Sequence, residues 1–94
     1  MADDRAQVTL VIEGRAQGVF FRASTLEQAQ SLNVTGWVKN CGDGSVEVVA
    51  EGARSALDQL IAWCHHGPPA ARIDHVGIRW SAFKDEFDTF RIVR

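Results

Sequence analysis

The sequence predicts an α+β sandwich in which two helices pack on one face of a mainly antiparallel sheet. Three observations support this fold class. Several short segments alternate apolar with other residues, which is typical of strands. Two longer segments repeat apolar residues every three or four positions, which is typical of helices that bury one face. Finally, 94 residues with 46% hydrophobic and 23% charged residues are enough for one domain around one core.

The first half of the chain is predicted to form a strand, a helix and a hairpin. A strand is expected over residues 8–13. Its apolar face carries Val8, Leu10 and Ile12. A helix is expected to begin near Phe21 and to end at Asn33. Its buried stripe consists of Phe21, Thr25, Ala29 and Leu32. Residues 34–40 and 45–51 then alternate on either side of an Asp-Gly turn, which predicts a hairpin.

The second half adds a helix and two strands. The apolar stripe of this helix consists of Leu57, Leu60, Ile61 and Cys64. Ser55 and Asp58 resemble a capping pair, and a Gly-Pro-Pro segment at residues 67–69 ends the helix. Strands are predicted over residues 72–80 and, more briefly, 89–93, where Phe90 and Ile92 share a face. The resulting order is βαββαβ with a short extra C-terminal strand, which fits a ferredoxin-like sandwich and sets the first helix beside the first strand of the hairpin.

The loop between the first strand and the first helix is typical of an anion-binding turn. Gly14 and Gly18 bracket it, and their freedom lets successive backbone N–H groups converge. The helix that follows adds unpaired N–H groups and the positive end of its dipole. Arg22 then provides a planar fork of donors that suits phosphate. Because the segment has neither the Walker A spacing nor the dinucleotide fingerprint, we do not expect a nucleotide-binding loop of either kind.

A second segment joins this loop in a recognisable pattern. Gly18 to Arg22 reads Gly-Val-Phe-Phe-Arg, and Gly36 to Glu47 contains Gly-Trp-Val-Lys-Asn followed by Asp-Gly-Ser-Val-Glu. With the Phe-x-Ile ending at residues 90–92, these motifs resemble the acylphosphatase family over almost the whole chain. Ala16 departs from the pattern, since a valine is more usual at that position.

The resemblance implies metal-independent hydrolysis of the carboxyl-phosphate bond of acyl phosphates to carboxylate and inorganic phosphate, with no cofactor. Arg22 would bind the phosphate and Asn40 would orient the attacking water. The phosphate-binding loop would comprise Arg15, Ala16, Gln17, Gly18, Val19 and Phe20. Inorganic phosphate would be both product and competitive inhibitor. The resemblance also implies a single domain over residues 1–94, of which we expect residues 1–5 to be flexible.

Charge and composition narrow the range of partners. The net charge of −2 predicts no broad basic surface, so we expect neither nucleic-acid nor membrane binding. Arg15, Arg22 and Lys39 still gather positive charge near the two motifs, which favours a small anionic ligand. The polar, acidic N-terminus lacks the features of a secretory signal, which predicts a cytoplasmic protein. We also expect a monomer.

Other reactive or aromatic residues are expected to have simpler roles. Cys41 and Cys64 lack the spacing of a disulfide scaffold or a zinc site and are expected to be free thiols, the first exposed and the second in the core. No metal-binding motif is formed by His65, His66 and His75. We expect packing roles for Phe20, Phe21 and the partly buried Trp37, Trp63 and Trp80. The acidic stretch over residues 85–88 is expected to be a solvated loop.

Two alternatives remain open at this point. One is an acylphosphatase-like domain of a larger carbamoyl-transfer maturation factor that acts on carbamoyl phosphate; the end of the chain at Arg94, with no zinc-finger cysteines after it, argues against this. The other is a non-catalytic ferredoxin-like module that binds RNA or a small ligand. An RNA-recognition module carries aromatic residues on a central strand, and residues 46–49 have none. Hydrolysis in the presence of a chelator distinguishes the enzyme from the module.

Overall fold

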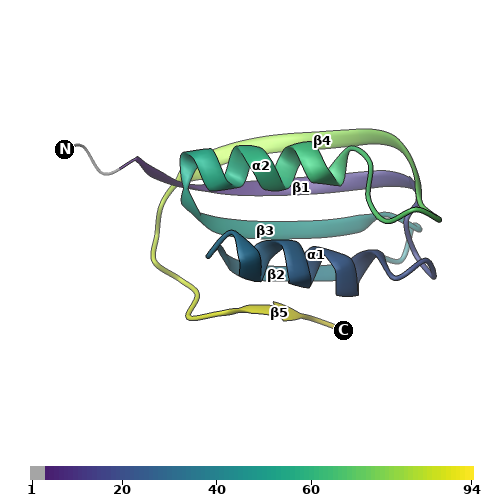
Figure 1. Cartoon of the computed structure of the whole chain (residues 1–94), viewed down its shortest axis with the longest axis horizontal. Helices are drawn as coiled ribbons and strands as arrows, with labels where there is room; N and C mark the ends of the chain where they lie inside the picture. The colour runs from purple at the N-terminus through teal and green to yellow at the C-terminus, as the bar shows by residue number, and fades with distance from the viewer. Residues whose placement is uncertain (1–3) are drawn as a thin grey trace.

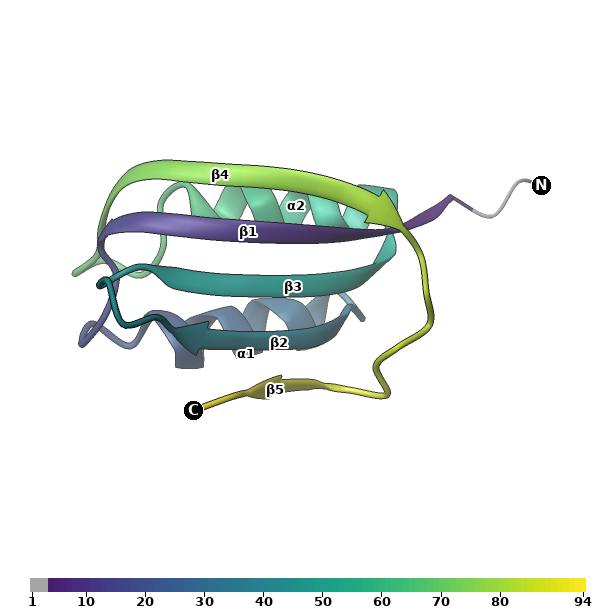
Figure 2. The same ribbon diagram turned by 180° about the vertical axis from the view of Figure 1, so that it is seen from behind.

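Two helices cover one face of a five-stranded sheet, as Figure 1 shows, and the view from behind in Figure 2 shows no helix of the described chain on the other face. The structure is a computed structural model that describes residues 4–94. Its elements are β1 (Arg5–Arg15), α1 (Phe21–Ser31), β2 (Thr35–Asn40), β3 (Val46–Ala53), α2 (Arg54–Cys64), β4 (Arg72–Ala82) and β5 (Phe90–Ile92). This is the predicted βαββαβ order with an added C-terminal strand, and the predicted α+β class is confirmed.

The strands lie in the order β4-β1-β3-β2-β5. The pairs β1–β4, β1–β3 and β2–β3 are antiparallel, whereas β2 and β5 are parallel, with Val38 opposite Ile92. Because β1 is antiparallel to β3, the end of β1 lies beside the start of β3, where the β2–β3 turn also lies. The loop that follows β1 and the residue that ends β2 therefore meet at one end of the sheet (Figure 1).

The core lies between the sheet and the helices, and the predicted helical stripes are confirmed except at Leu32, which follows α1 and is only partly buried. In α1 the buried residues are Phe21, Thr25 and Ala29, and in α2 they are Ala56, Leu57, Leu60, Ile61 and Cys64. The helices meet where the rings of Phe21 and Trp63 lie with centroids 5.3 Å apart. Asn33 follows α1 with a φ of 58°, a left-handed conformation that asparagine tolerates, and so ends the helix as predicted.

Local structure departs from prediction at the start of α2 and at the start of the chain. The helix begins at Arg54 rather than after Ser55, its N-cap is Ala53, and no side chain caps it. The expected pairing of Ser55 with Asp58 is therefore wrong, and Asp58 instead accepts a hydrogen bond from the Arg54 guanidinium at 3.5 Å. Residues 1–5 were predicted to be flexible, and positions 1–3 of this segment lie outside the described residues. Arg5, however, is already paired with Ala53 in the sheet.

The acidic stretch after β4 is tied to the sheet by Glu51, a carboxylate that is only 1% exposed on β3. Its oxygens accept hydrogen bonds from the backbone N–H groups of Lys84, Asp85 and Glu86 at 2.7, 3.1 and 2.9 Å, and Gln7 Nε2 donates to it at 3.2 Å. The side chains of Asp85 and Glu86 are exposed, as predicted for a solvated loop. The backbone of that loop is nevertheless anchored, which fixes the path of the chain into β5.

We expect Glu51→Ala to lower the free energy of unfolding by about 3 kcal/mol, because several charge-assisted hydrogen bonds would be lost and three amide groups left without their acceptor. Urea unfolding measures the change. Glu27→Ala, which removes an exposed carboxylate from α1, is the matched control and is expected to change the value by less than about 0.5 kcal/mol. Equal stability of the two variants would contradict the anchoring role of Glu51.

Cys41 and Cys64 are both free thiols. Cys64 is buried in the core as predicted, whereas Cys41, which was expected to be exposed, is half-buried. Burial raises the pKa of the Cys64 thiol from 9.0 to about 12. In the unfolded chain this thiol ionises first as the pH rises, so the unfolded state then binds fewer protons than the native state and stability falls.

We therefore expect the free energy of unfolding to fall by about 1 kcal/mol more in the wild type than in Cys64→Ala between about pH 8 and about pH 10. Urea unfolding at the two pH values measures this difference. Cys41→Ala is the control and should follow the wild type. A Cys64→Ala protein with the wild-type pH slope would contradict the prediction.

Candidate active site

The loop between β1 and α1 has a backbone that suits an anion. Gly18 and Phe20 both adopt left-handed conformations, with φ of 75° and 63°. At Gly18 a Cβ would meet no atom within 4 Å, so the positive φ and not lack of space favours glycine there. Alternation of left-handed residues with others turns successive N–H groups toward one side, as in anion-binding nests.

Within the described part of the chain, no acidic side chain or capping group neutralises the N-terminus of α1. The first hydrogen bond of the helix runs from the N–H of Ser24 to the carbonyl oxygen of Phe20 at 3.0 Å, so earlier N–H groups have no acceptor within the helix. The N-cap residue is Phe20, no described side chain makes a capping hydrogen bond to the helix, and the first turn carries no acidic residue. The partial positive charge of the helix end is therefore available to a ligand.

A cavity of about 300 Å³ opens beside this loop and helix end. Residues from three parts of the chain line it, among them Ala16, Gly18, Phe20, Arg22, Asn40 and Ile92. Arg22 is half-buried, and no ion pair holds it within the described part of the chain. The structure thus brings Arg22 of α1 and Asn40 of β2 to the same cavity, the juxtaposition that the ferredoxin-like order predicted.

Asn40 ends β2 on the same side of the strand as the buried Val38. Its Oδ1 is buried, and it has no hydrogen-bond partner among the described residues. A buried polar atom without a partner costs roughly 1–3 kcal/mol, so such atoms call for an explanation. A donor in the cavity, such as a water molecule, would satisfy this oxygen.

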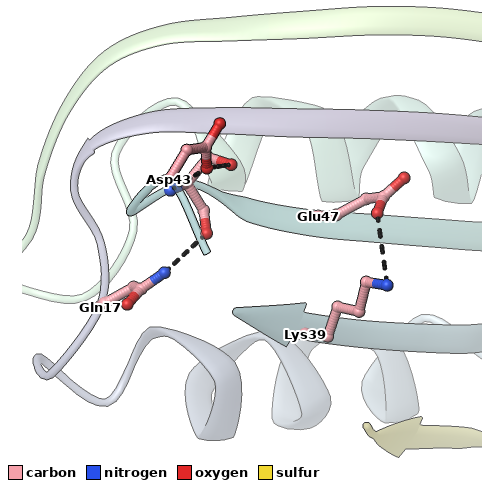
Figure 3. Close-up of polar contacts among 5 residues, drawn as sticks. Gln17, Lys39, Asp43 and Glu47 are labelled. Carbon is pink, nitrogen blue, oxygen red and sulfur yellow. Dashed lines mark hydrogen bonds and ion pairs between the residues drawn. The ribbon is translucent and has the colours of Figure 1, made fainter. Parts of the chain in front are cut away.

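Gln17 connects the loop to the turn that follows Asn40. Its Nε2 donates to the carbonyl oxygens of Cys41 at 2.9 Å and Ser45 at 2.8 Å. Figure 3 shows the Gln17 side chain directed toward this turn, and the turn itself is closed by Asp43. Asp43 accepts from the N–H and the hydroxyl of Ser45 at 2.9 and 2.6 Å, which lowers the pKa of its carboxyl group. Gln17 therefore fixes the loop relative to the strand end that carries Asn40.

We expect Gln17→Ala to lower the free energy of unfolding by about 1–2 kcal/mol, because two hydrogen bonds are lost and two carbonyl oxygens lose their donor. It is also expected to lower kcat by about tenfold, since the loop and Asn40 would no longer be held in register. Urea unfolding and steady-state kinetics measure both effects. Gln59→Ala, an exposed position on α2, is the control. A stable Gln17→Ala protein with full turnover would contradict the role of this connection.

Only part of the predicted phosphate-binding loop lines the cavity. Ala16, Gly18 and Phe20 do so, whereas Arg15, Gln17 and Val19 do not. Arg15 is exposed and paired with Arg72 across β1 and β4, and Val19 packs against the core. The expected concentration of three cations is wrong for Lys39, which does not line the cavity. Lys39 precedes Asn40 on β2 and so projects from the opposite side of the strand. Its Nζ lies 4.0 Å from Glu47 Oε1 (Figure 3).

Two aromatic or apolar side chains also have unexpected positions. The expected packing role is confirmed for Phe21, which is 1% exposed, and is wrong for Phe20, which is 82% exposed. The three tryptophans are partly buried, as predicted. Ile92 lines the cavity, although sequence reasoning placed it only on one face of the last strand. Its alternation with Phe90 was visible in the sequence, but the parallel pairing of β5 with β2 was not.

No group of three or more potential metal-ligating side chains occurs within residues 4–94. In the same part of the chain, no helix has the length and apolar character needed to cross a bilayer. Fold and cavity together define a ferredoxin-like α+β protein whose site combines an arginine and a helix N-terminus, which suit an anionic ligand, with a carboxamide oxygen that has no partner among the described residues and suits a hydrogen-bond donor.

Comparison with known proteins gives the family. Residues 8–92 match the family model for acylphosphatase. An acylphosphatase from Geobacter sulfurreducens is 50% identical over 88 residues, which cover 94% of either chain, and one from Pelotomaculum thermopropionicum is 46% identical over 88 residues, covering 94% of this chain and 96% of that protein. The structure of an acylphosphatase from Coxiella burnetii matches with a TM-score of 0.90 and 36% identity, covering 96% of this chain and 94% of that one. The chain belongs to the acylphosphatase family, and the acylphosphatase function implied by the sequence is confirmed.

Proposed function

We propose that this acylphosphatase hydrolyses the carboxyl-phosphate bond without a metal ion, with Arg22 holding the phosphoryl group and Asn40 positioning the water. The single observation that carries the proposal is that the cavity joins an arginine and a buried carboxamide oxygen, neither of which has an ion-pair or hydrogen-bond partner among residues 4–94 that would occupy it. The first suits an anion and the second suits a neutral donor, which are the two components that hydrolysis of an acyl phosphate requires.

The chemistry fits this small set of groups. A new bond forms between the water oxygen and phosphorus, and the bond between phosphorus and the carboxylate oxygen breaks. The leaving carboxylate is stable at neutral pH and needs no proton, and the proton of the attacking water passes to the phosphate. The protein is left to orient the reactants and to stabilise the charge on the phosphoryl oxygens.

Each group has a distinct part in this reaction. The guanidinium of Arg22 donates two parallel hydrogen bonds to phosphoryl oxygens. Backbone N–H groups of the loop over residues 15–20 and of the α1 N-terminus donate to the remaining oxygens. Asn40 accepts a hydrogen bond from the water through Oδ1, and as a neutral group it does not repel the anionic substrate.

The test is hydrolysis of benzoyl phosphate by the purified protein in the presence of a chelator. We expect full turnover, release of benzoate and inorganic phosphate in equal amounts, and competitive inhibition by added phosphate. Loss of activity in chelator with recovery on adding a divalent cation would contradict a metal-independent reaction. Saturable binding of phosphate or RNA without any turnover would contradict the enzymatic function itself.

The proposal extends to the state of the protein. The described residues form one sheet covered by two helices, with a small cavity at one end of the sheet. We propose that the protein is a monomer with a single domain over residues 1–94, is active in the cytoplasm and does not bind nucleic acid. Sedimentation equilibrium at enzyme concentrations that show full activity tests the first statement. A concentration-dependent loss of specific activity on dilution would contradict it.

A further inference from the structure

Four large hydrophobic side chains are exposed among the described residues: Val11 at 37%, Phe20 at 82%, Ile78 at 46% and Ile92 at 39%. Scattered exposed apolar residues are normal, but two of these four come together. Phe20 and Ile92 line the cavity that also contains Arg22 and Asn40. One side of the cavity is therefore apolar and lies beside Arg22 and Asn40, the residues proposed to bind the phosphate and the water.

Neither the backbone conformation at position 20 nor the exposure of its side chain favours phenylalanine. Phe20 is the N-cap of α1 with φ 63° and ψ 22°, a conformation in which glycine or asparagine costs less than a bulky residue. Its ring is also left almost entirely in water. A large apolar residue at a position that disfavours it on both grounds is typical of a functional site. The ring of Phe20 leaves water only when a ligand covers it.

Ile92 reaches the cavity through the pairing of β5. Parallel pairing places Ile92 opposite Val38 on β2, two residues before Asn40. Phe90, two residues earlier on β5, is buried in the core and holds the strand in place. The Glu51 contacts fix the chain that leads into β5. Ile92 is thus held at the cavity by the pairing of β5 with β2 and by the anchored chain that leads into β5.

We propose that Phe20 and Ile92 bind the acyl group, so that the enzyme prefers acyl phosphates whose acyl part is aromatic or branched and apolar. This inference rests on the proposed function. Arg22 and the backbone N–H groups recognise the phosphoryl end, which all acyl phosphates share, so selection among substrates must come from the acyl end. Of the cavity-lining residues only Arg22 is charged, and it is engaged by phosphate. Covering Phe20 and Ile92 by an apolar acyl group removes apolar surface from water and favours binding.

The experiment compares kcat/KM for benzoyl phosphate with kcat/KM for acetyl phosphate in the wild type, Phe20→Asn and Ile92→Ala. Asparagine tolerates the left-handed backbone of position 20, so this variant removes the ring without adding strain. We expect the benzoyl-to-acetyl ratio to fall by about 5- to 30-fold in each variant, the range that loss of part of an apolar pocket produces. Dividing by the wild-type ratio cancels the different intrinsic reactivities of the two substrates.

Ile78→Ala is the matched control, because Ile78 is an exposed isoleucine on β4 that does not line the cavity. It should keep the wild-type ratio. Equal ratios in all four proteins, with both substrates hydrolysed, would overturn the acyl-site inference and leave the proposed function standing. A wild-type protein that hydrolyses neither substrate would overturn the proposed function instead. A ratio that falls as far in Ile78→Ala would also overturn the inference, since a general effect of losing an exposed isoleucine would then explain it.

Discussion

Arg22→Ala is expected to lower kcat/KM for benzoyl phosphate by about 10³-fold or more and to abolish competitive inhibition by inorganic phosphate. Arg22 is the charged residue that lines the cavity, and no carboxylate within residues 4–94 forms an ion pair with it. Arginines that stabilise a transferring phosphoryl group contribute factors of about 10³–10⁵ to turnover. Steady-state kinetics over a range of phosphate concentrations measures both losses in the same assay.

The control for this variant is Arg79→Ala. Arg79 is an exposed arginine on β4 that pairs with Thr9 on the helix-free face of the sheet, so its removal changes the net charge equally without touching the cavity. Its kcat/KM and its inhibition by phosphate should stay within about twofold of wild type. A comparable loss in both variants would assign the effect of Arg22 to overall charge. Retained phosphate inhibition in Arg22→Ala would contradict its role in binding phosphate.

Asn40→Ala is expected to lower kcat by about 10²- to 10³-fold while the inhibition constant for phosphate stays within about threefold of wild type. The first effect follows because loss of one group that orients a reactant or stabilises the transition state costs about this factor. The second follows because, in the proposed mechanism, Arg22 and the backbone N–H groups of the loop hold the phosphate and Asn40 does not. The separation of turnover from phosphate binding is the signature of a water-positioning role.

Two further variants make this result specific. Lys39→Ala changes the preceding residue, whose side chain projects from the other side of β2 and pairs with Glu47, and it should retain wild-type kinetics. Asn40→Asp keeps the size of the side chain but places a negative charge beside the phosphate, so we expect it to lose turnover and to weaken phosphate inhibition as well. Full turnover in Asn40→Ala would contradict the assigned role.

Most of the fold could be predicted from the sequence because its signals are local. The alternation in residues 8–13 predicts which face of the strand is buried, and the stripe through Phe21, Thr25 and Ala29 does the same for the helix. Both faces are buried as expected. Asn33 ends α1 because a left-handed residue is needed there. Ser55 and Asp58 misled prediction, since a capping motif is a weak signal where Arg54 can extend the helix and pair with Asp58.

The candidate site was predictable only in part. Arg22 and Asn40 belong to motifs that could be recognised in the chain, and the element order implied that they meet. Phe20 was expected to pack beside Phe21, but its left-handed backbone turns the ring out of the core. No spacing in the sequence indicated that Gln17 would bond to the turn after Asn40 or that Ile92 would reach the cavity.

The sequence by itself determined the elements, their order and the faces that they bury, because these follow from local periodicity and turn chemistry. Arg22 and Asn40, the residues proposed to bind phosphate and orient water, were indicated by motifs that resemble the acylphosphatase family. Only the tertiary structure decided which side chains surround the reacting groups. Parallel pairing of β5 with β2 brought Ile92 to the cavity, and the buried carboxylate of Glu51 anchored the loop before it. These contacts join residues far apart in the chain, so they depend on the packing of the whole sheet and leave no periodic trace in the sequence.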